Sequence, residues 1–250
     1  MCILKAVILC AGYGKRLEGY SKQYQKTMLP LHGKPVLEYI LNGMIYAGLR
    51  DIIMVVGYKK EQIINYFNKG TKWGINIEYV EQNELNGTGG AIVLCESLIK
   101  NDHFYLTWGD IIVPYEIYKK VYLLYKNEKQ DFILVTNYTE DTSQGAAVVC
   151  QDDYCLDIIE KPPYGTINSK LNNCGIFLLS TEIFHVLKKL EPSSRGEIEL
   201  PQALSLGINK LNWKIRVLKM RNDQFRGDIG NLKIYEKLKE NNNWIKKLIP

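Results

Sequence analysis

The nine residues 9–17 have the composition of a phosphate-binding loop. They spell LCAGYGKRL, an apolar run followed by Gly12, Gly14 and Arg16, and Lys26 comes ten residues after Arg16. Glycines let the backbone approach a phosphate closely and turn its N–H groups toward it, while Arg and Lys supply fixed positive charge. This pattern predicts a triphosphate site. The alternative is that the glycines only shape a turn between a strand and a helix.

Two well-known nucleotide loops do not fit this segment. A Walker loop has four residues between its glycines and then Lys-Ser or Lys-Thr, which this chain lacks here. The dinucleotide fingerprint has a small residue three positions after its second glycine, where this chain carries Leu17. Neither a P-loop nor a dinucleotide site is therefore indicated.

A second glycine-rich segment could hold a base. Gln82 ends a predicted strand, and residues 86–91, NGTGGA, precede a predicted helix. The Gln amide has both a donor and an acceptor, so it can pair with the edge of a base, and the glycines let a flat ring lie against the backbone. The alternative is that Gln82 is an ordinary surface residue.

Two aspartates could bind a metal ion. Asp110 follows the apolar segment HFYLTWG, at the carboxyl end of a predicted parallel strand, where open α/β sheets bind their ligands. Asp228 lies in RGDIG, before the last predicted helix. Two such carboxylates together with substrate phosphates would suit Mg²⁺. Either aspartate could instead cap a helix.

Polar residues on the later strands suit a phosphorylated sugar. Gly145, Glu160, Lys161 and Asn173 lie at or near the ends of predicted strands. Glu and Asn pair readily with sugar hydroxyls, and Lys161 could bind a phosphate. A solvent-exposed strand end would equally explain the Glu-Lys pair.

The elements that must position these residues alternate between strand and helix. This alternation predicts βαβ units around a mostly parallel sheet within a single domain. After residue 145 three strands follow one another without full helices between them, which predicts hairpins. Strands are expected at 5–9, 52–56, 75–80, 104–108, 132–137, 146–150, 156–160, 174–179 and 213–220, and helices at 35–47, 60–67, 89–98, 115–125, 181–190, 197–206 and 232–241.

Composition excludes several classes of protein. The longest apolar runs are far shorter than the roughly 20 residues that span a bilayer, and the first residues lack the features of an export signal. Six cysteines without a CxxC pair suggest reduced thiols, and three scattered histidines give a zinc site little to build on. The net charge of +5 is spread along the chain and suits an anionic small substrate. We expect a cytoplasmic protein that binds neither nucleic acid nor membrane.

Taken in order, these segments resemble the sugar-1-phosphate nucleotidyltransferases. This pyrophosphorylase family includes the glucose-1-phosphate thymidylyltransferases and the UTP-glucose-1-phosphate uridylyltransferases, and the resemblance covers nearly the whole chain. It is carried by LCAGYGKRL, KTMLP with GKP, Gln82 with Gly87-Thr88-Gly89, Gly109-Asp110, Glu160-Lys161-Pro162, Asn173-Cys174-Gly175 and Gly227-Asp228-Ile229-Gly230.

The resemblance implies a single-domain α/β fold, Rossmann-like and similar to the GT-A nucleotide-diphospho-sugar transferases, with a mixed, mostly parallel sheet flanked by helices. It implies a nucleotide-binding half at about 1–110, a sugar-phosphate-binding half at about 111–230 and a C-terminal helix at 231–250. The implied nucleotide contacts are Leu9, Ala11, Gly12, Gly14, Gln82, Gly87 and Thr88, the sugar-phosphate contacts are Gly145, Glu160, Lys161 and Asn173, the catalytic residues are Arg16, Lys26, Asp110 and Lys161, and the Mg²⁺ ligands are Asp110 and Asp228.

The implied reaction is an in-line attack of a sugar 1-phosphate on the α-phosphorus of an NTP. We favour dTTP or UTP as donor and glucose 1-phosphate as acceptor. Guanylyl transfer to a mannose or heptose 1-phosphate, cytidylyl transfer to a phosphorylated alcohol, a non-catalytic nucleotide-sugar sensor and, less favoured, a nicotinamide-dependent oxidoreductase are the alternatives. Family members often form homo-oligomers. Because the chain ends about where the catalytic domain does, we expect no appended β-helix.

Two positions depart from the family pattern. Lys15 stands where the family usually has Thr or Ser, and Gln25 stands where it usually has Pro before the lysine. Position 15 contributes mostly backbone, so we expect little effect there. The second departure bears on where Lys26 is placed.

Overall fold

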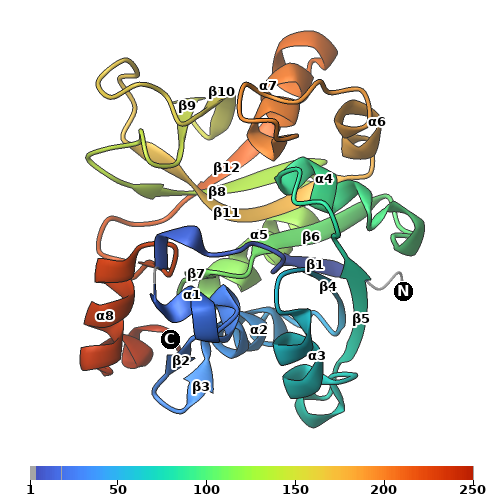
Figure 1. Cartoon of the computed structure of the whole chain (residues 1–250). Coiled ribbons are helices and arrows are strands. Elements are labelled where there is room, and N and C mark those ends of the chain that lie inside the picture. Colours follow the sequence, from blue (N-terminus) through green and yellow to red (C-terminus); the bar gives the residue numbers. More distant parts are fainter. Residues whose placement is uncertain (1–3, 18, 250) are drawn as a thin grey trace. The chain divides into compact units, whose positions relative to one another are not determined.

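Strands and helices alternate through the first half of the chain, as the sequence predicts (Figure 1). The computed structural model describes residues 4–17 and 19–249. They form two compact units. Of the residues described, unit 1 comprises 4–17, 19–85, 107–120 and 223–249, and unit 2 comprises 86–106 and 121–222.

Unit 1 is built on parallel strands. β5 (Asn76–Glu81), β4 (Asp51–Val56) and β1 (Ala6–Leu9) lie side by side in that order, and each neighbouring pair is parallel. β1 and the part of β4 that follows Asp51 are runs of Ala, Val, Ile, Leu and Met that are almost entirely buried. Such unbroken apolar strands are typical of parallel sheets that are covered on both faces.

Helices and short ribbons complete unit 1. α2 (Val36–Tyr46) follows Pro35 and ends before Gly48, whose φ of +91° favours glycine. α5 (Tyr115–Glu128) begins in this unit. Two ribbons of two residues per strand pair β2 (Pro30–Leu31) with β3 (Lys34–Pro35) and β7 (Ile111–Ile112) with β13 (Gly227–Asp228). The other helical elements are η1 (Lys15–Leu17), α1 (Gly19–Gln23), η2 (Lys26–Met28), α3 (Lys60–Phe67), η3 (Thr71–Trp73), α8 (Leu232–Glu240) and η5 (Asn243–Lys247).

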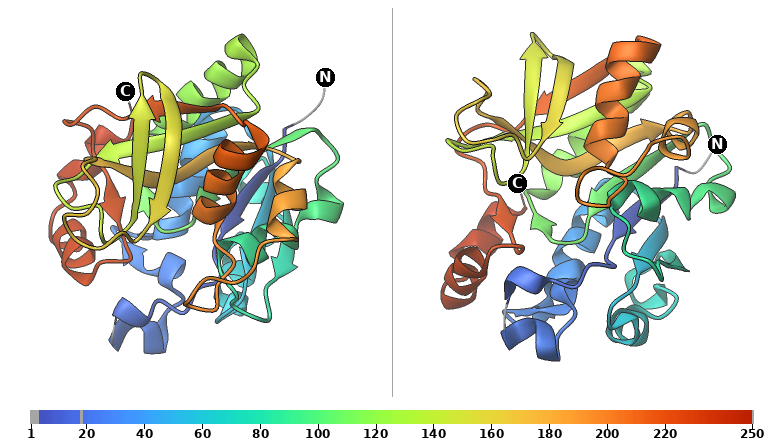
Figure 2. Two further views of the ribbon diagram at one scale, coloured as in Figure 1. Left: turned by 90° about the horizontal axis from the view of Figure 1, so that it is seen from above. Right: turned by 45° about the horizontal axis from the view of Figure 1, so that its top comes forward.

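Unit 2 holds a mixed sheet. Its strands follow the order β6 (His103–Trp108), β11 (Leu171–Ser180), β8 (Phe132–Tyr138), β12 (Ile215–Lys219), β10 (Tyr154–Glu160) and β9 (Ala146–Gln151). β12 is parallel to β8, whereas β11 is antiparallel to β8 and β10 is antiparallel to both β12 and β9. Figure 2 shows the β9–β10 hairpin as two adjacent yellow strands, with α7 (Leu200–Leu211) in orange beside it.

The remaining helices of unit 2 differ from the sequence prediction. The single helix expected at 89–98 is wrong: α4 (Thr88–Val93) ends early and a separate turn, η4 (Glu96–Leu98), follows it. α6 (Ile183–Leu187) is shorter than expected. α7 begins at Leu200 rather than 197, with Pro201 in its first turn, where a proline needs no hydrogen-bond partner for its nitrogen.

The structure describes five of the six cysteines. Cys10, Cys95, Cys150, Cys155 and Cys174 form no disulfide bond, while Cys2 lies outside the described residues. Across residues 4–17 and 19–249, no helix has the length and apolar character that a membrane crossing requires.

Candidate active site

The loop 9–17 begins where the parallel strands of unit 1 end. The Cys10 N–H donates to Val55 O at 2.8 Å, and Leu9 O accepts the Gly109 N–H at 3.0 Å. Ala11 O accepts the Tyr58 N–H at 3.1 Å. The carboxyl ends of several strands therefore meet around Leu9 and Ala11, which is the position where open α/β sheets bind ligands.

Gly57 is a residue of this region that the sequence analysis missed. A methyl group at Gly57 would lie 3.0 Å from Ala11 O and 3.1 Å from Gln82 O. The glycine therefore lets the phosphate-loop backbone and Gln82 come close together. Its only sequence signal is its place after the strand IIMVV. Gln82 is itself 6% exposed and its N–H donates to Val56 O, so it is not the ordinary surface residue that the alternative required.

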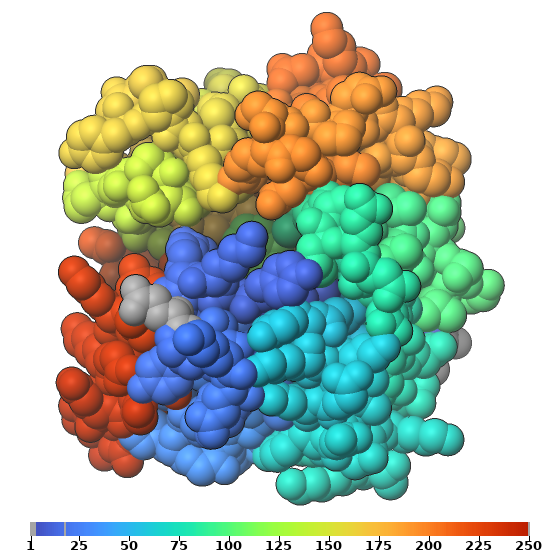
Figure 3. All heavy atoms as spheres, in the orientation of Figure 1, coloured from blue at the N-terminus to red at the C-terminus, as the bar shows by residue number. Residues whose placement is uncertain are grey.

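The glycines of the loop have different roles. Gly14 has φ +66°, and a methyl group there would lie 3.1 Å from the Cβ of Lys26, so this glycine allows the loop to pack against the lysine. Gly12 has open space around it. Buried Leu17 anchors η1 to the unit, and the loop itself reaches the surface, where Figure 3 shows its atoms in dark blue. A cavity of about 200 Å³ is lined by Gly14, Lys15, Arg16, Leu17, Lys26 and Gly230.

Gln25 fixes Lys26 at the edge of this cavity. The side chain of Gln25 is fully buried; its Nε2 donates to Cys10 O, and its Oε1 accepts from the N–H and the hydroxyl of Thr27. Its backbone N–H donates to Gln62 Oε1 at 2.8 Å. This residue caps η2, which begins with Lys26. The departure from the family pattern at position 25 is thus compensated by a set of buried hydrogen bonds.

Asp110 and Asp228 approach each other through the β7–β13 ribbon. Asp228 pairs with Ile111 in this ribbon, and the Ile229 N–H donates to Asp110 O at 2.9 Å. A methyl group at Gly230 would lie 3.0 Å from Asp228 Oδ1 and 3.7 Å from Asp110 Oδ2. Both carboxylates therefore face the same small space beside Gly230.

Asp228 does not cap the last helix, so that alternative is wrong. The cap of α8 is Asn231, whose side chain accepts the Ile234 N–H. Asp228 Oδ1 instead accepts the Gly230 N–H at 2.9 Å, and Oδ2 pairs with Arg226 at 3.2 Å. These contacts orient the carboxylate toward the space shared with Asp110.

Cations surround the two carboxylates. Lys26 Nζ forms an ion pair with Asp110, and both side chains are largely buried. The Nη2 of Arg16 lies 3.0 Å from the methyl position at Gly230 that also approaches both aspartates. Within residues 4–17 and 19–249, no group of three or more His, Cys, Asp or Glu could hold a metal ion by itself. Two carboxylates fit Mg²⁺, which usually binds one or two protein carboxylates together with oxygens of the substrate phosphates.

Gly87 and Thr88 lie in unit 2, in a segment whose glycines are required by close packing. A methyl group at Gly87 would lie 2.5 Å from Ile198 O, and one at Gly89 would lie 2.6 Å from the Ile198 side chain. The Thr88 hydroxyl accepts the Leu200 N–H at 3.0 Å. The glycines of this segment therefore allow α4 to pack tightly against the segment before α7, and their contact with a nucleotide stays a prediction.

Gly145, Glu160 and Lys161 come together at the open end of the β9–β10 hairpin. Glu160 pairs with Ala146, and the Lys161 N–H donates to Gly145 O at 2.7 Å. A methyl group at Gly145 would lie 2.1 Å from Asn172 Oδ1, which requires glycine there. Lys161 has φ +43°, a strained conformation for a residue with a side chain.

Asn173, on β11, has a donor group available. Its Oδ1 accepts the Gly175 N–H at 2.8 Å, which fixes the orientation of the amide. Its Nδ2 is buried and has no hydrogen-bond partner among the residues described. A buried donor without a partner is costly, and a ligand oxygen or a water molecule would satisfy it.

Arg195 joins this region although the sequence analysis did not select it. Its guanidinium donates to Glu199 Oε1 at 2.7 and 3.1 Å and to Glu160 Oε1 at 3.4 Å. Burial, followed by the nearby Glu199 carboxylate, raises the pKa of Glu160, and Arg195 and Lys161 oppose that shift. The i,i+4 spacing of Arg195 and Glu199 was visible in the sequence, but their approach to β10 was not.

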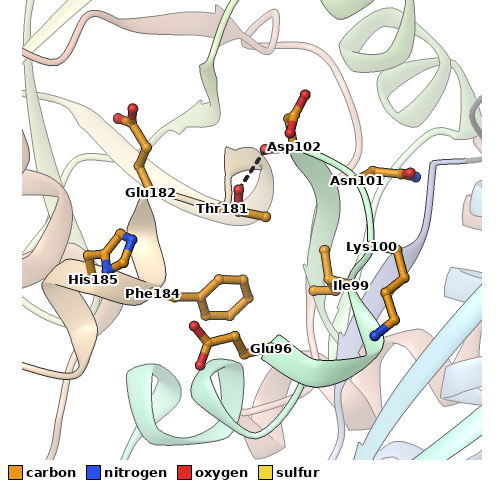
Figure 4. Close-up of a pocket in the computed structure, with 9 residues that line it drawn as sticks. All are labelled: Glu96, Ile99, Lys100, Asn101, Asp102, Thr181, Glu182, Phe184 and His185. Atoms are coloured by element: carbon orange, nitrogen blue, oxygen red, sulfur yellow. Dashed lines mark hydrogen bonds between the residues drawn. The ribbon is translucent and has the colours of Figure 1, made fainter.

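A larger cavity in unit 2 contains none of the predicted site residues. It measures about 360 Å³ and opens beside the start of β6 and α6. Figure 4 shows Glu96, Glu182 and His185 around it, and a hydrogen bond of 3.2 Å from the Thr181 hydroxyl to Asp102 O. Size alone therefore does not locate the candidate active site.

Comparison with known proteins identifies the family. The protein family described as "Nucleotidyl transferase" matches residues 5–243. The chain belongs to this family. The bifunctional protein GlmU of Methanococcus maripaludis is 35% identical over 98% of this chain, which covers 56% of that protein. The chain thus spans about half the length of several curated relatives that it matches.

A relative of similar length and a solved structure agree with this assignment. UTP-glucose-1-phosphate uridylyltransferase AglF of Haloferax volcanii is 31% identical over 91% of both chains. The structure of a UDP-glucose pyrophosphorylase complexed with UDP-glucose aligns with a TM-score of 0.86 and 24% identity, over 96% of this chain and 98% of that one. The structural likeness confirms the predicted Rossmann-like α/β fold of the nucleotidyltransferases.

Proposed function

We propose that this chain transfers a nucleotidyl group from an NTP to a sugar 1-phosphate, giving an NDP-sugar and pyrophosphate. The observation that carries the proposal is the convergence of Lys26, Arg16 and the carboxylates of Asp110 and Asp228 beside Gly230. A triphosphate needs fixed cations, and a metal shared with it needs carboxylates. All four groups lie at the end of the glycine loop in unit 1.

The chain's own residues support an in-line displacement. An oxygen of the sugar 1-phosphate attacks the α-phosphorus, and the bond to the pyrophosphate oxygen breaks with its electron pair. The attacking oxygen is already anionic at neutral pH, so no general base is needed, and the protein has to hold mutually repelling anions in line. We assign Arg16 and Lys26 to the nucleotide phosphates and Lys161 to the attacking phosphate.

Asp110 and Asp228 would hold Mg²⁺ in this proposal. The bound ion would neutralise part of the charge on the α-phosphate and on the leaving pyrophosphate. Lys26, paired with Asp110, places a cation beside the same carboxylate, and Arg226 does so for Asp228. These pairs orient both carboxylates before a substrate arrives.

The remaining contacts are assigned by the same proposal. Leu9, Ala11, Gly12, Gly14, Gln82, Gly87 and Thr88 serve the nucleotide, and the region around the hairpin end serves the sugar phosphate. There, the Asn173 amide offers a donor, and the Glu160 carboxylate can accept from hydroxyls. A nucleotide-binding half at about 1–110 and a sugar-phosphate-binding half at about 111–230 stay part of the proposal, as do a cytoplasmic location, homo-oligomer formation and the absence of nucleic-acid binding.

The names of the relatives favour a particular substrate pair. AglF is named for UTP and glucose 1-phosphate, and the aligned pyrophosphorylase structure contains UDP-glucose. We therefore favour UTP, with dTTP next, and glucose 1-phosphate as acceptor. Guanylyl or cytidylyl transfer and a non-catalytic nucleotide-sugar sensor are the competing functions.

Pyrophosphate release tests the proposal directly. The chain is incubated with Mg²⁺, each of UTP, dTTP, CTP, GTP and ATP, and each of glucose, mannose, N-acetylglucosamine and heptose 1-phosphates, with the Asp110→Ala variant as control. We expect release that requires both an NTP and a sugar phosphate and that the variant lacks. If no combination releases pyrophosphate and the same sample binds a nucleotide sugar tightly, the proposal of catalysis is wrong and the sensor function is favoured.

A further inference from the structure

Two cysteines face each other across the β9–β10 hairpin of unit 2. Cys155 on β10 pairs directly with Cys150 on β9, and both are free thiols. Directly opposed residues of an antiparallel pair project from the same face of the sheet. The two strands are the adjacent yellow arrows of Figure 2.

The loop of this hairpin determines which kind of pair the cysteines form. Only Asp152 and Asp153 separate the paired residues Gln151 and Tyr154, and Asp152 has φ +51°, as tight hairpin turns require. The residues that close a two-residue loop form a hydrogen-bonded pair. Since the two kinds of pair alternate along the strands, the next pair, Cys150 with Cys155, is not hydrogen-bonded.

That position suits a covalent link between the two sulfurs. In a pair that is not hydrogen-bonded, the Cα atoms are about 4.5 Å apart. Disulfides join residues whose Cα atoms lie about 4.4 to 6.8 Å apart. The hairpin can therefore accept a disulfide between these residues by rotation of their side chains, without movement of its backbone.

The two thiols differ in how accessible they are. Strand β9 is the last in the sheet order, and Cys150 on it is only partly buried. Cys155 is 4% exposed, pairs on its other side with Ile215, and its thiol donates to Asp157 O at 3.2 Å. Burial raises the pKa of both thiols, that of Cys155 to about 12, while Lys219 opposes the shift at Cys150. A reagent from solvent would thus meet Cys150 first.

We propose that Cys150 and Cys155 form a dithiol modification site that reacts with a small disulfide, such as oxidised glutathione. The Cys150 thiolate attacks one sulfur of the reagent, whose disulfide bond breaks, and one reagent thiolate leaves. The Cys155 thiolate then attacks Cys150 Sγ and releases the second reagent thiol. The protein loses two hydrogen atoms and gains one cross-strand disulfide, and the reagent is reduced to two thiols.

This site is separate from the predicted substrate contacts and does not depend on the proposed function. It lies at the loop end of the hairpin, whereas Gly145, Glu160 and Lys161 lie at the open end. The described thiols elsewhere have no opposed cysteine: Cys10 and Cys95 are buried, and Cys174 packs against Met220. The pairing is specific to positions 150 and 155 among the residues described.

Oxidation of the native full chain by oxidised glutathione tests the site. After acid quenching and digestion, mass spectrometry should show a peptide link between Cys150 and Cys155, with reversal by a dithiol reductant. Cys155→Ser should stop at glutathione retained on Cys150, and Cys150→Ser should abolish the reaction at both positions. Cys95→Ala, which alters a buried cysteine elsewhere, is the matched control and should react as the wild type does.

Two results would overturn the proposal. One is stable glutathione on Cys150 in the wild type, which would place Cys155 out of reach. The other is an unchanged pair of thiols in a sample whose fold is intact by circular dichroism. A second measurement uses phenylarsine oxide, which bonds two neighbouring thiols at once: we expect one equivalent to be retained by the wild type and lost in either serine variant.

Discussion

The charged cluster beside Gly230 in unit 1 and the one around Arg195 in unit 2 consist of different side chains. In unit 1, Arg16 and Lys26 line a cavity of about 200 Å³, and Asp110 and Asp228 lie beside Gly230 at its edge. In unit 2, Arg195 pairs with Glu160, Glu197 and Glu199, and the buried amide of Asn173 lies on β11 of the same unit. Fixed cations suit phosphate, whereas carboxylates and an amide suit hydroxyl groups. The two clusters thus carry the chemistry of the two proposed substrates.

The clusters also differ in how backbone and side chains contribute. In unit 1, glycines and a capped turn bring the charges together: Gly14 packs on Lys26, Gln25 caps η2, and Gly230 leaves room for the two carboxylates. In unit 2, the charged side chains come from the end of β10 and from the segment before α7. The glycines that allow close backbone packing are visible in the sequence, whereas the approach of Arg195 to Glu160 is not.

Asp110→Ala removes one of the two carboxylates of the unit 1 cluster. If unit 1 holds the metal and the triphosphate, turnover should fall by at least about 100-fold, the usual loss for a group that stabilises transition-state charge. Pyrophosphate release against Mg²⁺ concentration measures it. Near-normal turnover in a variant with an unchanged melting temperature would contradict the metal assignment.

Arg16→Ala removes a cation that lines the same cavity and is to be compared with Asp110→Ala. It should cost a similar factor because a cation near the phosphates is lost, but the Mg²⁺ concentration at half-maximal activity should stay as in the wild type. A shift of that concentration equal to the shift in Asp110→Ala would show that the two residues do not have separate roles.

Glu160→Gln should separate function from stability in unit 2. Loss of a charged acceptor should raise KM for the sugar phosphate by about 10-fold or more. Because burial raises the pKa of Glu160, ionisation of this residue opposes folding, so the variant should melt higher than the wild type at neutral pH.

The pH dependence of that difference has a definite sign. A raised folded-state pKa means that the wild type loses stability as pH rises from the ordinary glutamate value of 4.5 through the folded-state value. Below this window both proteins carry a neutral side chain and should melt alike. Thermal melts across the range measure it, and a lower melting temperature for Glu160→Gln at neutral pH would show that the pair with Arg195 outweighs burial.

Gln25→Ala tests whether the capped turn positions Lys26. Three buried hydrogen bonds of its side chain are lost, at a cost of about 1 to 3 kcal/mol in the free energy of unfolding. We expect kcat to fall several-fold with little change in KM for the sugar phosphate. Urea unfolding and steady-state kinetics check both effects. Gln62→Ala, which loses the bonds to the Gln25 N–H and to Gln23 O but keeps the Gln25 side chain, should fall between the wild type and Gln25→Ala. A stability loss with unchanged kcat would leave Gln25 a purely structural residue.

Lys15→Thr should have the smallest effect. Lys15 is exposed, and its ammonium lies 5.8 Å from the centre of the Tyr13 ring, a weak interaction at the surface. We expect kcat/KM for the NTP to change by less than about twofold. A loss comparable to that of Arg16→Ala would mean that unit 1 uses a third cation on the phosphates.

Local sequence patterns are sufficient to predict the alternation of strands and helices, the fold class and the members of the unit 1 cluster. These features depend on local patterns: apolar runs of strand length, glycines where the backbone turns or comes close to a neighbour, and charged residues a few positions from a strand end. Helix 60–67 is an example, since the sequence predicted the bounds that α3 has.

The contacts between residues far apart in the chain become visible in the folded structure and not in the sequence. Two-residue strands such as β7 and β13 carry no periodicity, yet their pairing brings Asp228 beside Asp110. Gly57 lies against Ala11 and Gln82, Arg195 donates to Glu160, 35 residues away in the chain, and Gln25 makes buried hydrogen bonds that no spacing rule shows. Such contacts depend on how each strand packs and pairs, which a linear pattern does not contain.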